Sequence, residues 1–124
     1  MRRDEATLLD IARAARLVLA FKQGMTKEAF LDDSKTQSSV LYQLIVIGEA
    51  VKRLSSEFRA RHPEILWSLI AGMRDHLIHG YDAVDWDEVW KTAMVDVPDL
   101  LGKIESLLPK ARSEPQENNT STNN

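Results

Sequence analysis

Apolar residues recur at helical spacing along most of the chain, and no alternating strand pattern competes with them. A first helix is predicted over about residues 5–22, with Gly24 as its stop. A short one follows over residues 26–31, with Thr26 as its N-cap. The longest segment begins at a Ser34 cap, and its apolar stripe is Leu41, Leu44, Ile47, Val51, Leu54 and Phe58.

Two further helices complete the pattern. His62-Pro63 ends the long segment, and a helix over residues 63–79 should turn Leu66, Leu69, Ile70, Met73 and Leu77 inward before stopping at Gly80. The last helix spans about residues 85–108, and Pro98 should kink or divide it. Four long helices with short connections predict an all-α fold, an antiparallel four-to-five-helix bundle.

The C-terminal end differs in composition from the rest of the chain. After Pro109 the sequence reads KARSEPQENNTSTNN, and from residue 113 it has no apolar side chain. Such a segment cannot bury a face, so we expect a disordered polar tail over residues 111–124. The remaining residues, 1–110, fit one domain, whose core is small enough to gain from dimerisation.

The amino-acid composition excludes several kinds of functional site. The chain has no cysteine, which excludes disulfides, thiolate metal sites and a cysteine nucleophile. Its three histidines form no metal-ligand pattern, so no metal and no cofactor is predicted. Charged residues interrupt the N-terminal 21 residues, which leaves no signal peptide or membrane span, and the expected location is cytoplasmic.

The formal net charge of −3 argues against a broad nucleic-acid-coating surface. Basic residues nevertheless gather at Lys52-Arg53, Arg59, Arg61-His62 and Arg74. That stretch is the candidate for a phosphate-facing surface. The alternative, a solvated helix end, is favoured by composition alone.

The stretch 72–81, GMRDHLIHGY, is dense in groups that bind phosphate, move protons or accept modification. Arg74 offers a planar cation, and His79 is a base or acid near neutral pH. Asp75 lies four residues before His79, so on one helix it would share its face and orient the imidazole. The alternative is that all three are ordinary surface charges and that His79 merely complements the helix dipole.

These residues resemble a known family. Arg74, the polar Asp75, three further positions and His79, followed by Gly80 and Tyr81, match the motif of the HepT-like branch of the HEPN superfamily. Further similar features are Ile47-Gly48-Glu49-Ala50, Ala71-Gly72-Met73 and Val84-Asp85-Trp86. The resemblance extends from Asp4 to about Leu108, and its one departure is Asp75, where the family often has asparagine.

The resemblance implies a HEPN-type bundle that forms a homodimer, with two motifs facing each other across a cleft. It implies a toxin of a type VII-like toxin–antitoxin pair, a metal-independent endoribonuclease in which Arg74 and His79 are catalytic and Asp75 supports them. Because five residues turn about 500° in a helix, Arg74 and His79 would not share a face within one chain, and the dimer removes that difficulty. A nucleotidyltransferase antitoxin would transfer AMP from ATP onto Tyr81.

Two other functions stay open at this point. A HEPN domain without catalysis, binding a nucleotidyltransferase partner or a nucleotide, is favoured by Asp75 and the acidic net charge. A purely structural dimerisation bundle is the other. The less favoured alternative for Tyr81 is an aromatic residue at the rim of the bundle. Trp67, Trp86 and Trp90 are expected to be core and interface anchors rather than platforms on which bases stack. Glu49 is either an exposed acid or an ion-pair partner of Arg74.

Overall fold

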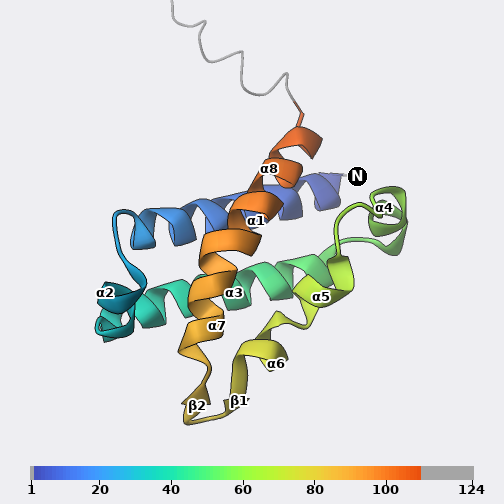
Figure 1. Cartoon of the computed structure of the whole chain (residues 1–124). Coiled ribbons are helices and arrows are strands. Elements are labelled where there is room, and N and C mark those ends of the chain that lie inside the picture. Colours follow the sequence, from blue (N-terminus) through green and yellow to red (C-terminus); the bar gives the residue numbers. More distant parts are fainter. Residues whose placement is uncertain (1, 110–124) are drawn as a thin grey trace, which may run out of the picture.

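Two antiparallel helices and a third that crosses them form the body of the protein (Figure 1). The computed structural model describes residues 2–109, and the predicted tail over 111–124 lies outside them. Helix α1 (Arg2–Lys22) lies beside α3 (Ser34–Arg53), and the continuous helical segment α7 (Trp86–Lys91), η1 (Thr92–Asp96) and α8 (Val97–Leu107) packs across both. The all-α prediction is confirmed.

The connection between α1 and α3 is built from local capping interactions. Gly24 has a φ of +76°, the left-handed conformation that ends α1 without strain. Thr26 caps the short α2 (Lys27–Leu31) by accepting a hydrogen bond from the Ala29 amide. Asp33, not Ser34, is the cap of α3. Hydrogen bonds from the Thr36 amide and hydroxyl lower the pKa of the Asp33 carboxyl, because they stabilise its charged form.

The long helix is shorter than its apolar stripe predicts. It ends at Arg53, and a separate helix, α4 (Ser56–Arg61), carries Phe58. Ser55 begins that helix by accepting from the Phe58 amide. The buried carboxylate of Asp4 in α1 accepts hydrogen bonds from the amide of Ser55 at 2.9 Å and from its hydroxyl at 2.8 Å. This tertiary contact fixes the break between the helices, which periodicity alone cannot reveal.

The predicted helix over residues 63–79 is wrong. The structure has α5 (Trp67–Ala71), α6 (Met73–Leu77) and a two-stranded antiparallel sheet of β1 (Ile78–Gly80) and β2 (Ala83–Val84). Gly80 therefore lies in a strand rather than stopping a helix. Leu66 and Leu69 are 63% and 70% exposed, although the predicted helix turned them inward.

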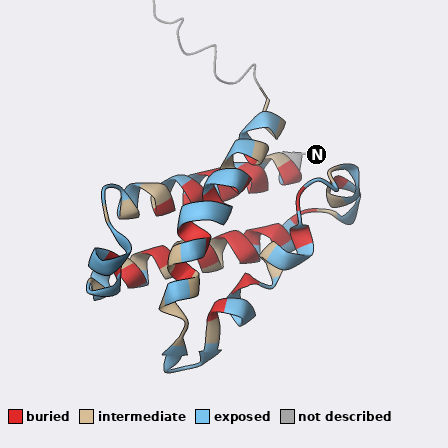
Figure 2. Cartoon of the chain, viewed as in Figure 1, coloured by how far each residue is buried: buried red, intermediate tan, exposed pale blue. Residues whose placement is uncertain are grey.

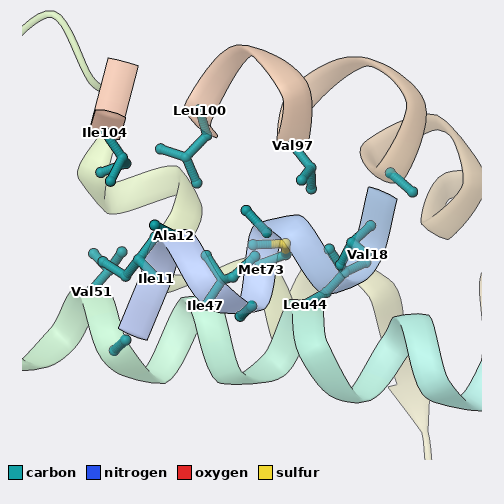
Figure 3. Close-up of a cluster of buried hydrophobic side chains, with 14 of the residues drawn as sticks. Ile11, Ala12, Val18, Leu44, Ile47, Val51, Met73, Val97, Leu100 and Ile104 are labelled. Carbon is teal, nitrogen blue, oxygen red and sulfur yellow. The ribbon is translucent and has the colours of Figure 1, made fainter. Parts of the chain in front are cut away.

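Buried side chains line the faces on which the three long segments meet (Figure 2). Figure 3 shows Ile11 and Val18 of α1, Leu44 of α3 and Leu100 and Ile104 of α8 converging in this core. The predicted interruption at Pro98 takes the form of the π-turn η1 directly before it, and Pro98 lies in the first turn of α8. Since proline has no amide to donate, the change of helix type there is expected.

Candidate functional site

The residues singled out in the sequence lie on one projecting segment, α6 followed by the β1–β2 hairpin (Figure 1). Arg74 is exposed in α6, and His79 is exposed in β1. Tyr81, in the turn between the strands, is 99% exposed. The segment therefore presents a cation, an imidazole and a phenol to solvent within eight residues.

Two buried residues of α6 hold this segment to the body. Met73 is 8% exposed and Leu77 is fully buried, so the inner face of α6 is part of the core while Arg74 and Asp75 face outward. The carbonyl of Leu77 accepts a hydrogen bond from the Asp85 amide at 2.9 Å, which closes the base of the hairpin. Ile78 then pairs with Val84 across the strands.

A hydrogen bond between two side chains and a helix cap add to this closure. His76 Nε2 lies 3.0 Å from Glu88 Oε2, which links α6 to α7. Asp85 caps α7 by accepting from the Glu88 amide at 3.0 Å. His76 thus joins two helices, a role that its sequence position did not reveal because Glu88 lies twelve residues later.

A close backbone contact explains why a glycine, Gly48, lies in the middle of α3. A Cβ built there would lie 3.1 Å from the Ile70 carbonyl oxygen and 3.9 Å from Met73 Cβ. A side chain at this position would push the Ile70 carbonyl away by a few tenths of an ångström, so glycine lets α5 and the start of α6 pack most closely against α3. Gly48 therefore sets the position of the segment that carries Arg74.

Two predicted partnerships are absent within residues 2–109. Asp75 and His79 form no hydrogen bond there, and the strand after Leu77 takes His79 out of the helix whose face the prediction had them share. Glu49 is exposed and pairs with Lys52 at 3.0 Å rather than with Arg74, since the two lie one turn apart on α3.

The tryptophans belong to the packing, as expected. Trp67 is buried, and its indole donates to the carbonyls of Arg59 at 3.1 Å and His62 at 2.9 Å. Trp90 packs against Phe30 with ring centroids 5.1 Å apart. Trp86 is half-buried against the core.

An apolar groove of about 410 Å³ lies beside the projecting segment. Its walls come from α5 and α6 on one side and η1 and α8 on the other, with Ile47 of α3 at its base. Leu66 and Leu69 at its rim expose more than three fifths of their surface. Sequence reasoning missed this groove because it assigned both leucines to the core.

Residues 2–109 contain no group of three or more histidine and carboxylate side chains arranged to hold a metal ion. None of the helices in this part of the chain is both long and apolar enough to cross a bilayer.

The helical fold and the exposed Arg74–Tyr81 segment agree with the class of protein that the sequence motif indicated, the small helical HepT-like ribonucleases. The family described as "Ribonuclease HepT-like" matches residues 11–107. The chain belongs to the HepT-like ribonuclease family.

Individual relatives support the same family assignment. The chain is 47% identical over 100 residues to a Thermococcus cleftensis protein named "Probable ribonuclease HepT", covering 81% of this chain and 91% of that protein. It is 36% identical over 109 residues to a Methanocaldococcus jannaschii protein that bears the name of a putative RNase, covering 88% and 90%. A similarly named protein of Caldanaerobacter subterraneus is 38% identical over 90 residues, covering 73% and 80%. No solved structure matches the chain significantly.

Proposed function

We propose that the chain is a metal-independent endoribonuclease, the toxin of a toxin–antitoxin pair, which cleaves RNA with Arg74 and His79 and is neutralised by AMPylation of Tyr81. The observation that carries the proposal is that a member of the HepT-like ribonuclease family exposes these three side chains together on the segment formed by α6 and the β1–β2 hairpin. The scaffold beneath them is fixed by buried Leu77 and its hydrogen bond to Asp85.

Cleavage without a metal requires a base, an acid and a cation. A base removes the proton of the RNA 2′-hydroxyl, whose oxygen attacks the adjacent phosphorus. The bond to the 5′-oxygen breaks as an acid protonates that leaving group, and a cation stabilises the negative charge that develops on the phosphoryl oxygens. His79 supplies the proton transfers and Arg74 the cation. The products are a 2′,3′-cyclic phosphate and a 5′-hydroxyl, and DNA, which has no 2′-hydroxyl, is not cut.

The count of available imidazoles favours a homodimer. Within residues 2–109, His76 is hydrogen-bonded to Glu88 and His62 lies at the end of α4, so His79 is the exposed imidazole of the projecting segment that has no hydrogen-bond partner. Because the reaction uses a base and an acid at once, a second copy of the chain would supply the second His79. The groove with exposed Leu66 and Leu69 beside the motif is the apolar surface that such a copy would cover.

The exposed position of Tyr81 supports the proposed regulation by modification. In the proposed step the Tyr81 phenol oxygen attacks the α-phosphorus of ATP, pyrophosphate leaves and the phenolic proton is released. A nucleotidyltransferase antitoxin would catalyse this step, and a 99% exposed phenol is accessible to it. The product carries a nucleotide and a negative charge two residues from His79, which would block the site and repel RNA phosphate.

A cleavage assay in EDTA tests the activity. Wild-type protein should cut single-stranded RNA and leave cyclic-phosphate ends. His79→Ala should lower the rate about 10²–10⁴-fold, and Arg74→Ala about 10²–10³-fold. His76→Ala is the matched control, because it removes an exposed histidine of the same segment that is engaged with Glu88 and should retain most activity.

The outcomes separate the candidate functions. Full activity of His79→Ala would refute the proposed chemistry. A folded, unmodified protein that cuts no RNA but binds a nucleotidyltransferase would support the non-catalytic alternative. For the modification, incubation with the antitoxin and ATP should add one AMP to wild type and to Tyr42→Phe but none to Tyr81→Phe, since Tyr42, 63% exposed, is the other tyrosine of the chain.

A further inference from the structure

The corner where α3 meets α4 has a concave basic surface, formed by residues that precede the hairpin in the sequence. It encloses about 490 Å³, and we call it the α3–α4 corner. Its residues are Arg3, Asp4, Lys52, Arg53, Leu54, Ser55, Ser56, Glu57, Arg59 and Arg61. In Figure 1, α4 and the start of α1 lie at one end of the molecule, apart from the β1–β2 hairpin.

The charge of this corner is opposite to that of the protein as a whole. Five basic and two acidic residues give the corner a formal charge of +3, whereas the chain carries −3, so the rest of it carries −6. One of the two acids, Asp4, is buried and held by Ser55. Glu57 is therefore the one exposed carboxylate among the residues that line the corner.

Most of these cations are not neutralised internally. Within residues 2–109, Arg3, Arg53, Arg59 and Arg61 form no ion pair, although the chain has more carboxylates than basic groups. Lys52 is paired with Glu49. The Nε of Arg59 is buried and has no hydrogen-bond partner, which leaves a donor without an acceptor.

The backbone of the corner is fixed before any ligand arrives. Asp4 holds Ser55 through two hydrogen bonds, and the Trp67 indole holds the end of α4 through the Arg59 and His62 carbonyls. The guanidinium of Arg61 lies 5.9 Å from the centre of the Phe58 ring. Such preorganisation lowers the cost of binding, because less of the chain must be ordered.

We propose that the α3–α4 corner binds the phosphate backbone of the RNA substrate and positions the strand that the hairpin cleaves. Guanidinium groups predominate in the corner, and their planar fork fits phosphate oxygens. The competing ligand is an acidic protein. Unlike an RNA strand, it has no phosphates that recur at regular spacing along the chain. This proposal rests on the proposed ribonuclease function.

Binding measured on a cleavage-deficient protein tests the corner separately from catalysis. The parent is His79→Ala, and the probe is a short fluorescein-labelled single-stranded RNA titrated at salt concentrations from about 50 to 300 mM. The test variant adds Arg53→Gln and Arg61→Gln. The matched control adds Arg13→Gln and Lys35→Gln, which are exposed, have no ion pair within residues 2–109 and change the net charge equally.

Losing two phosphate contacts should flatten the slope of log Kobs against log salt by about 1.4, since each contact to a single strand contributes about 0.7. At 0.1 M salt that corresponds to about 25-fold weaker binding. The control should match the parent within about twofold. Because Arg61 contacts Phe58, a second variant with Arg3→Gln and Arg53→Gln repeats the test without that contact, and melting curves verify folding.

Three results would overturn the proposal: a test variant that binds like the control, a parent that binds no RNA, or equal competition by polyglutamate of the same length. The ribonuclease proposal is judged by cleavage in the wild-type background. There, the corner variant should raise KM and leave kcat unchanged. If cleavage depended on His79 but the corner variant had the KM of wild type, the proposal for the α3–α4 corner would be refuted and the ribonuclease proposal would be retained.

Discussion

Substitution of Gly48 by alanine tests the close contact that positions the motif. In open helix, alanine is favoured over glycine by about 1 kcal/mol. At Gly48 the new Cβ would lie 3.1 Å from the Ile70 carbonyl oxygen, so the backbone of α5 must move by a few tenths of an ångström. Overpacking a core commonly costs about 1–3 kcal/mol. We therefore expect a net loss of about 1 kcal/mol, with a range from about 0 to 2.

Gly102 provides the matched control for this substitution. It lies in α8, is exposed, and a Cβ there meets nothing within 4 Å. Gly102→Ala should therefore stabilise the protein by about 1 kcal/mol. Thermal unfolding followed by circular dichroism should separate the two variants by about 2 kcal/mol, or roughly 8 °C in Tm. If Gly48→Ala were as stabilising as Gly102→Ala, the inferred contact between α3 and α5 would be wrong.

Two further predictions concern charges. The Asp4 carboxyl has its pKa lowered from 3.8, because burial, which raises it, is outweighed by the Ser55 hydrogen bonds and by nearby Arg3. A lowered native pKa contributes stability above the unfolded value and loses it as pH falls through the native one. Asp4→Asn should thus cost about 1–2 kcal/mol at pH 7, and in denaturant titrations this difference should shrink below pH 3.8; a constant difference would contradict it. Asp75→Asn removes an exposed negative charge beside Arg74 and should lower KM for RNA about two- to fivefold, equivalent to roughly 0.5–1 kcal/mol; an increased KM would show that the carboxylate supports binding.

Periodicity predicted the elements whose stability comes from a continuous apolar face. Helices α1 and α3 and the α7–α8 segment bury regular stripes, exemplified by Leu8, Leu44 and Ile104, so their positions could be predicted from spacing. Thr26 and Gly24 were also predictable, because a side-chain cap and a left-handed glycine act within a few residues.

The region between residues 54 and 85 was not predictable in the same way, because its structure depends on contacts between residues that are not neighbours on one helix. Asp4 reaches Ser55 across 51 positions and separates α4 from α3. The Asp85 amide reaches the Leu77 carbonyl and ends α6 in favour of a strand. A pattern of apolar residues contains neither contact, so it extended both helices. The motif residues themselves were identifiable, but their placement on a hairpin was not.

On this hairpin segment, the residues that hold the site in position are different from the residues that would react. The segment is held by the close packing at Gly48 and by two hydrogen bonds, one at the Leu77 carbonyl and one between His76 and Glu88. Arg74, His79 and Tyr81 have no ion-pair or hydrogen-bond partner of their own within residues 2–109, so nothing there competes with a substrate or a modifying enzyme for them. Substitutions of Gly48 or the buried Leu77 should therefore change stability and, through it, activity, whereas the exposed contact between His76 and Glu88 should contribute little to either. Substitutions of the exposed residues should change activity while the melting temperature stays nearly constant, as is usual for surface positions.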